Sequence, residues 1–158
     1  MNPVIGALRE ALDRDHARLE NLFCQLMAAF EADARDEIYS LWSALDAGLT
    51  AHMDAEEKGI LPLFAKAYPE EAAALLGEHH TLRSRLMELG VGVDLHLVRA
   101  ETAAAFIDVL RRHAKREDEL LYRWADERLN STDRAAALQL VTSQHGNGSP
   151  DSTVGLAP

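Results

Sequence analysis

The sequence predicts an all-α protein: an up-and-down antiparallel four-helix bundle with a short fifth C-terminal helix and a disordered tail. Four consecutive segments place apolar side chains three and four residues apart, which is the spacing of one helix face. No segment alternates apolar and polar residues over a useful length. Aromatic residues make up only 6% of the chain, and this composition also favours helices over strands.

The first two helices are predicted over residues 4–31 and 34–66. In each, one apolar stripe runs along the whole segment. Gly59 and Pro62 fall near the end of the second segment, where both residue types weaken a helix. We therefore expect a kink or a helix end at that point.

The third helix is predicted to begin at Pro69, because proline is favoured in the first turn of a helix. Its stripe ends at Leu89, and the stretch GVGVDLH at residues 90–96 is expected to break the helix. Asp94 is then expected to cap the fourth helix, which is predicted over residues 96–129.

The fourth stripe is ambiguous after Glu117, because either Leu120 or Leu121 continues it towards Trp124. Both leucines fall close to the helical spacing, so periodicity does not choose between them.

The chain of 158 residues suits a single bundle at residues 1–130, followed by a short helix and a flexible tail at residues 131–158. Ser131 and Asp133 are expected to cap the short helix, which should end near Gln144. The remaining HGNGSPDSTVGLAP is rich in glycine, serine and proline, so it is predicted to be disordered.

Charge and hydropathy exclude several classes of partner. A net charge of −10 and an isoelectric point near 5.1 argue against nucleic acid and against an anionic membrane surface. No stretch is long and apolar enough to span a membrane, and the N-terminus lacks a signal-peptide pattern. A single cysteine excludes an internal disulfide. These features predict a cytoplasmic protein.

Polar side chains interrupt the apolar stripes at one level of the bundle. One histidine lies near the middle of each stripe, and two of these histidines are followed by a glutamate one helical turn later. Helix midpoints share one layer in an antiparallel bundle, so these side chains should converge. The six residues are His16, His52, Glu56, His79, His113 and Glu117.

A metal centre explains such a layer better than ordinary packing does. A single histidine on an apolar stripe is more often a hydrogen-bonded core residue than a ligand. Four histidines with two carboxylates are harder to satisfy, because an unpaired buried polar group costs about 2–7 kcal/mol. Imidazole and carboxylate ligands suit iron, manganese or zinc, and two ions bridged by the carboxylates would use all six residues.

The ordered motifs resemble those of the hemerythrin-like (HHE cation-binding) family. They read DRDH at His16, HMDAE at His52 and Glu56, GEHHTLR at His79, and HAKRE at His113 and Glu117. The resemblance covers about residues 4–129. It implies a non-haem di-iron centre with an oxo or hydroxo bridge, carboxylates that span the two irons, and an open site for O2 or a similar small molecule.

The sequence departs from the oxygen-carrying members of that family. Their third helix carries H-x-x-x-H, whereas neither His79 nor His80 is followed by a second histidine at that spacing. Their fourth-helix spacing fits Asp118, although Glu117 fits the apolar stripe better. Whether His80, Arg83 or Asp118 contributes to the site stays open. One histidine fewer should leave an iron coordination position open.

Three functions are compatible with these residues. The first is a sensor or binder of O2 or another diatomic such as NO. The second is a di-iron enzyme that acts on peroxide or NO, and the third is an iron-handling protein or a structural bundle that holds zinc. The sequence identifies no separate catalytic residue and no protein partner.

Overall fold

The computed structural model describes residues 6–143, and nearly all of them are helical, with no strand among them. The prediction of an all-helical protein is confirmed for this part of the chain. The elements are α1 (Ala7–Glu31), α2 (Arg35–Gly59), α3 (Leu61–Ala67), α4 (Pro69–Asp94), α5 (Ala100–Arg116), the π-helix η1 (Glu117–Tyr122), α6 (Arg123–Arg128) and α7 (Ser131–Ser143).

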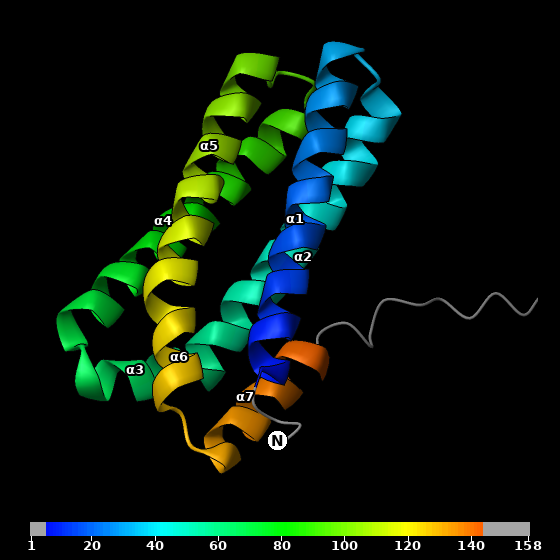
Figure 1. The fold of residues 1–158 in the computed structure, drawn as a ribbon. Coiled ribbons are helices and arrows are strands. Elements are labelled where there is room, and N and C mark those ends of the chain that lie inside the picture. The colour runs from blue at the N-terminus through cyan, green and yellow to red at the C-terminus, as the bar shows by residue number, and fades with distance from the viewer. Residues whose placement is uncertain (1–5, 144–158) are drawn as a thin grey trace, which may run out of the picture.

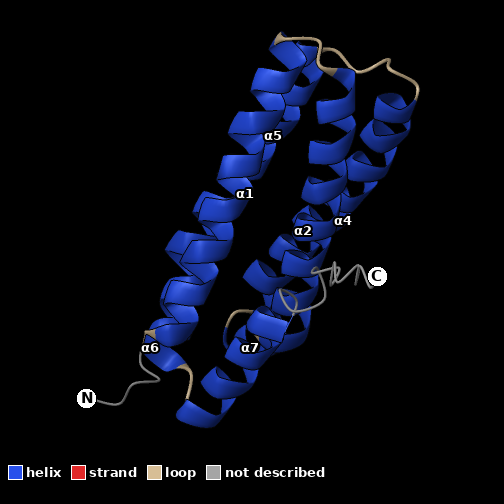
Figure 2. Ribbon diagram, turned by 90° about the vertical axis from the view of Figure 1, so that its right-hand side faces the viewer, coloured by secondary structure: helices blue, strands red, loops and turns tan. Residues whose placement is uncertain are grey.

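Figure 1 shows α1, α2, α4 and α5 as long helices that lie alongside one another, while α3, α6 and α7 gather at one end. The chain direction alternates from each long helix to the next, and η1 and α6 continue the line of α5. Figure 2 shows the same arrangement from the side. Helix α1 contacts α2 and α5, and α4 contacts the same two helices. Each long helix therefore has two long neighbours.

Two predicted boundaries agree with the structure. Helix α2 ends at Gly59, where a Cβ atom would lie 3.0 Å from Leu140 Cδ1 of α7, so a larger residue would require the Leu140 side chain to shift by a few tenths of an ångström. Pro69 is the first residue of α4, where its missing N–H costs no helical hydrogen bond.

The predicted break at residues 90–96 occurs only at the end of that stretch, and the predicted cap is wrong. Helix α4 continues to Asp94, so this aspartate ends one helix rather than capping the next, which begins at Ala100. The glycines in this stretch serve packing instead. A Cβ at Gly92 would lie 2.7 Å from Val98 Cγ2 in the connection to α5, so the glycine permits that contact.

The short fifth helix is present as α7, but its cap differs from the prediction. The Asn130 side-chain oxygen accepts a hydrogen bond from the Asp133 backbone N–H at 2.8 Å, so Asn130 caps the helix rather than Ser131. Helix α7 packs against α1 and α2, with Ala137 and Val141 buried. The predicted flexible tail at residues 144–158 lies outside the described residues.

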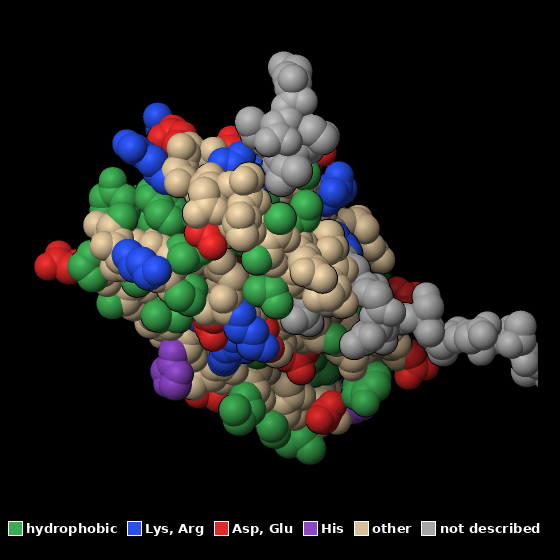
Figure 3. All heavy atoms as spheres, turned by 90° about the horizontal axis from the view of Figure 1, so that it is seen from below, with side chains coloured by type: hydrophobic (Ala, Val, Ile, Leu, Met, Phe, Trp, Pro, Cys, Tyr) green, Lys and Arg blue, Asp and Glu red, His purple; other side chains and the backbone are tan. Residues whose placement is uncertain are grey.

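Two apolar clusters bracket the middle of the bundle. Along α1, Leu12 belongs to a cluster near α3, α6 and α7, and Leu19 belongs to a second cluster towards the other end. His16 lies between them, so aliphatic layers separate its level from both ends of the bundle. Figure 3 views the end with α7 and shows apolar, acidic and basic side chains mixed over its surface. Within residues 6–143, no helix is both long and apolar enough to cross a membrane.

Candidate metal centre

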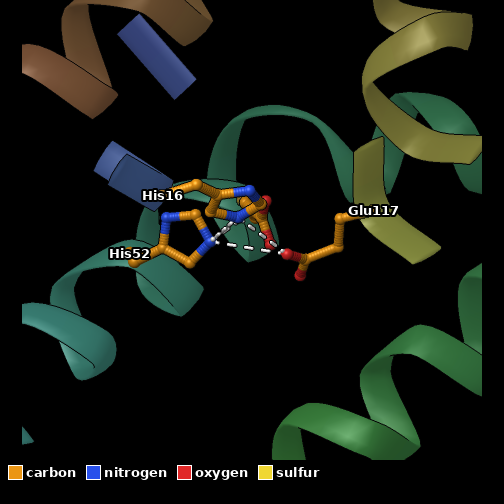
Figure 4. A group of neighbouring side chains, drawn as sticks. His16, His52 and Glu117 are labelled. Carbon is orange, nitrogen blue, oxygen red and sulfur yellow. Dashed lines mark hydrogen bonds and ion pairs between the residues drawn. The ribbon is translucent and has the colours of Figure 1, made fainter. Parts of the chain in front are cut away.

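The six residues singled out in the sequence meet in one layer between the long helices. His16 comes from α1, His52 and Glu56 from α2, His79 from α4 and His113 from α5, while Glu117 is the first residue of η1. Five of them are buried, and the His16 side chain is only 13% exposed. Figure 4 shows His16 and His52 pointing towards Glu117 across the interior. Their role as metal ligands stays a prediction, because the geometry alone establishes only their convergence.

Glu117 lies between two pairs of histidines. Its Oε2 atom is 3.1 Å from His16 Nε2 and 3.6 Å from His52 Nε2. Its Oε1 atom is 3.1 Å from His79 Nε2 and 2.6 Å from His113 Nε2. Each carboxylate oxygen therefore serves a different histidine pair.

Glu56, the glutamate of the other H-x-x-x-E motif, also lies between the two histidine pairs. Its Oε1 atom lies 3.5 Å from His52 Nε2, and its Oε2 atom lies 3.3 Å from His79 Nε2. The inward-facing atoms form two adjoining groups whose members lie within 4.8 Å of one another. The first group is His16, His52, Glu56 and Glu117, and the second is His79, His113 and Glu117. Two cation positions that share a carboxylate match this arrangement.

The donor atoms fit metal ions better than they fit each other. Glu56 Oε2 and His113 Nε2 are buried and have no hydrogen-bond partner in the described part of the chain, although charged groups lie close to both. His16 Nε2 and His52 Nε2 face each other at 3.2 Å, where two unprotonated nitrogens would repel. Cations would satisfy these nitrogens and oxygens together, and the donor types suit iron, manganese or zinc.

A second set of carboxylates lies beside the outward-facing ring nitrogens. Three of the four pairs are hydrogen-bonded, whereas His16 Nδ1 and Asp118 Oδ1 are close without a hydrogen bond in the described part of the chain. The Nδ1 atom of each of the four histidines lies close to a carboxylate oxygen from a neighbouring helix. The pairs are His52 with Asp15 at 2.7 Å, His79 with Glu57 at 2.9 Å, His113 with Glu78 at 2.6 Å, and His16 with Asp118 at 3.3 Å. A carboxylate that accepts the Nδ1 proton leaves Nε2 free to bind a metal, and it fixes the ring orientation.

These outer carboxylates form a closed ring around the layer. Each is the sequence neighbour of an inward-facing residue on its own helix, and each reaches the histidine of the next helix. Asp15 on α1 reaches the histidine of α2, and Glu57 on α2 reaches the histidine of α4. Glu78 on α4 reaches the histidine of α5, and Asp118 on η1 reaches the histidine of α1. The centre and its support therefore depend on the same side-by-side packing of the helices.

An arginine accompanies every outer carboxylate. The pairs are Arg18 with Asp15, Arg83 with Glu57 at 3.1 Å, Arg116 with Glu78, and Arg9 with Asp118 at 3.9 Å. These cations offset the negative charge of the ring and restrain the carboxylates that orient the histidines.

The three residues left open by the sequence are now placed. Arg83 lies behind His79 through Glu57, and Asp118 faces the outward nitrogen of His16. His80 is exposed and points away from the layer. Arg83 and Asp118 therefore lie behind two of the inward-facing histidines, outside the inward-facing set itself.

Sequence reasoning missed Tyr122, whose hydroxyl lies inside the centre. The hydroxyl donates a hydrogen bond to Glu56 Oε1 and lies 3.0 Å from His16 Nε2 and 3.3 Å from His52 Nε2. In an α-helix, residues five apart point about 140° away from each other. The π-helix η1 instead brings Tyr122 onto the same side as Glu117. The one signal was the uncertain register at Leu120 and Leu121, of which Leu121 is the buried one.

Electrostatics distinguish the charge states of the centre in the metal-free chain. Burial alone would lower the pKa of His16, but Asp118 and Glu117 outweigh it and raise the pKa to about 9. Burial is likewise outweighed at His79, where Glu117 and Glu56 raise the pKa to about 10. The pKa values of His52 and His113 are raised for the same reason. These histidines therefore hold protons that an incoming metal ion must displace.

The two glutamates shift in opposite directions. Burial would raise the pKa of Glu117, but hydrogen bonds from the histidines hold it well below its usual range. The pKa of Glu56 is raised by burial and by the nearby charge of Glu117.

Comparison with known proteins agrees with the motifs. The family model described as Hemerythrin HHE cation binding domain matches residues 7–125. No curated protein and no solved structure matches the chain. The family match spans α1 to the first half of α6 and includes every inward-facing residue of the layer. The resemblance inferred from the motifs is therefore confirmed, and the chain belongs to the hemerythrin HHE cation-binding domain family.

Proposed function

We propose that the chain holds two iron ions in this layer and binds O2 or another small diatomic such as NO there, as a binder or sensor. One observation carries the proposal: Glu56 and Glu117 each direct their two oxygens at different histidine pairs. A single cation would need only one oxygen from each carboxylate, whereas two cations use both. Zinc or manganese would suit the same donors.

The donor count leaves room for a small ligand. Four imidazole nitrogens and four carboxylate oxygens, shared between two cations, supply about four donors to each. Iron accepts further ligands beyond such a set, as in sites with two histidines and one carboxylate. Bound iron would supply the open coordination positions and the electrons that O2 or NO requires. The chain orients the nitrogens, and its apolar clusters limit access of water.

Tyr122 favours one further candidate, an enzyme that acts on peroxide or NO. Burial, followed by the charges of Glu56 and Glu117, raises the pKa of Tyr122 well above its usual range, so the phenol keeps its proton at neutral pH. A protonated phenol beside His16 and Glu56 can hydrogen-bond to a reacting oxygen or donate a proton to it.

Metal content tests the primary proposal directly. Protein from iron-replete cells, purified without added metal, should contain about two irons per chain by mass spectrometry. Its absorption spectrum should change on addition of O2 or NO and return on degassing. A matched His80→Ala variant should keep both irons, because that side chain is exposed, whereas His113→Ala should lose metal. Metal-free folded protein, or stoichiometric zinc, would contradict the proposal.

A further inference from the structure

A cleft between α1 and α5 opens onto the centre. It has a volume of about 320 Å³, and its lining includes His16, His52, His113 and Glu117. These residues come from both inward-facing groups, so the cleft reaches the shared part of the site rather than one edge of it.

A second opening, between α4 and α5, provides a comparison. It has a volume of about 430 Å³ but reaches only His113 among the six inward-facing residues. Glu78 and Arg116 line it, and Glu78 holds the outward nitrogen of His113. This opening therefore leads to the supporting ring, whereas the α1–α5 cleft leads to the donor atoms.

The α1–α5 cleft is larger than a diatomic ligand needs. A water molecule takes a share of about 30 Å³, so 320 Å³ corresponds to about ten waters. Pockets for small organic ligands begin at about 300 Å³. O2 or NO would fill only a small part of this space.

The lining indicates what kind of molecule fits. Leu19, Phe23 and Leu110 form an apolar wall beside the polar residues of the centre. At the rim, Arg111 binds Glu20 through two nitrogens, with Nε 3.0 Å from Oε2 and Nη2 2.6 Å from Oε1. This ion pair joins α5 to α1, and it neutralises the charges of Arg111 and Glu20 against each other. Lys115, also in the lining, lies 3.7 Å from Glu119. A charged ligand would therefore have to compete for partners that are already paired.

We propose that this cleft binds an uncharged small organic molecule with an apolar body and one oxygen-bearing head, of the class of organic hydroperoxides and their alcohols. The body lies along Leu19, Phe23 and Leu110, and the head faces the polar end of the cleft at His16, His52, His113 and Glu117. The orientation of the head rests on the proposed metal-binding function. The cleft itself is a property of α1 and α5.

Binding of an unreactive probe tests the proposal. We would titrate 2-phenyl-2-propanol, an uncharged tertiary alcohol with an aromatic body, into the full chain and follow binding by calorimetry. Ala17 and Ala74 are both exposed helical residues, and they line the α1–α5 cleft and the α4–α5 opening respectively. Ala17→Trp should obstruct the cleft and weaken binding by about tenfold or more, and Ala74→Trp should leave the affinity within about twofold. Circular dichroism would verify that both variants are folded.

The outcomes separate this proposal from the metal proposal. Absence of binding to the folded wild-type chain, or equal weakening by both tryptophan variants, would overturn the cleft assignment. Metal content is measured on the same samples, before and after treatment with a chelator. Probe binding that Ala17→Trp weakens, in protein that contains no iron as purified from iron-replete cells, supports the cleft and contradicts the metal proposal. Two irons per chain in folded protein that does not bind the probe would support the metal proposal and contradict the cleft assignment.

Discussion

The two H-x-x-x-E motifs are identical in spacing but differ in structure and charge. His52 and Glu56 lie within regular helix in α2, whereas Glu117 follows His113 at the point where α5 becomes the π-helix η1. Glu117 faces the inward nitrogens of all four histidines, and its pKa is lowered. Glu56 instead accepts a hydrogen bond from Tyr122, and its pKa is raised. One motif therefore supplies a carboxylate whose pKa is lowered, and the other supplies a carboxylate whose pKa is raised.

This difference shows that a motif does not define the role of its residues. The helix around the motif decides which partners reach each carboxylate. In η1, the wider turn places Tyr122 on the side of Glu117, and the tyrosine then bonds to Glu56 of the other motif. The contact between Tyr122 and Glu56 thus depends on one local change in helix type.

The largest expected effect comes from neutralising the two glutamates in turn. Glu117→Gln should lower the free energy of unfolding of the metal-free chain by about 3–5 kcal/mol, because it leaves buried protonated histidines without their anion. Glu56→Gln should cost only about 1 kcal/mol, because Gln can still accept the hydrogen bond from Tyr122. Denaturant titration of both variants measures the difference.

Metal content should follow the same order. Glu117 belongs to both inward-facing groups and Glu56 to one of them, so Glu117→Gln should lose more metal per chain. Equal losses of stability and metal in the two variants would show that the glutamates are equivalent.

The next effect is a pH dependence of the metal-free chain. A histidine with a higher pKa in the folded state stabilises that state fully below its unfolded pKa, and this contribution disappears as pH rises through the folded pKa. For His16 the window runs from 6.5 to about 9, which corresponds to a loss on the order of 3 kcal/mol. Glu117 has the opposite sign, so its contribution is lost as pH falls below 4.5.

We therefore expect the metal-free chain to be most stable between the usual pKa values of Glu, 4.5, and His, 6.5, and to weaken towards pH 9 and 10. Denaturant titrations across this range provide the measurement. In the matched variant His16→Gln, the free energy of unfolding should fall less steeply as the pH rises above 6.5. A stability that rises steadily from pH 6.5 to 10 would contradict the assigned charge states.

The inward-facing layer was predictable because it follows helix periodicity. His16, His52, His79 and His113 each interrupt an apolar stripe, and one period of about 3.6 residues identifies them without knowledge of the fold. The break expected at residues 90–96 comes only after Asp94, for a related reason. A glycine in a sequence can indicate either a helix end or a close approach between two elements. Gly92 lies inside the helix, and the close approach of Val98 explains why a glycine is there.

The outer ring and Tyr122 were not predictable in the same way. Asp15, Glu57, Glu78 and Asp118 each lie about 100° around the helix from an inward-facing neighbour, where charged residues are normally solvated. Only the side-by-side packing of helices turns those positions towards the next histidine. An acidic residue beside each inward motif was the available signal. Tyr122 depends on η1, and the apolar period does not reveal a π-helical turn.

A smaller effect is expected from the outer ring, and it should differ between a buried and a partly exposed carboxylate of that ring. Asp15, which supports His52, is buried, whereas the Glu57 side chain is 30% exposed. Asp15→Asn should weaken metal affinity by about 10–100-fold, as is typical when such a supporting carboxylate is lost, and Glu57→Gln should have a smaller effect. Competition with a chelator measures both affinities. The control is Asp13→Asn, which changes an exposed aspartate that pairs with Arg9. Affinity unchanged by Asp15→Asn would exclude a supporting role.

The smallest expected effect comes from Tyr122→Phe, which keeps the ring and removes the hydroxyl. The metal-free chain should lose about 1 kcal/mol of unfolding free energy, because Glu56 Oε1 loses a buried donor. Combined with Glu56→Ala, which removes the acceptor of this hydrogen bond, the loss should be non-additive, since the two side chains contact each other directly. Combined with Glu57→Gln it should be additive, because Glu57 faces the outward nitrogen of His79 and Tyr122 bonds elsewhere. Additivity in both double variants would place the hydroxyl outside the centre and remove the asymmetry between the motifs.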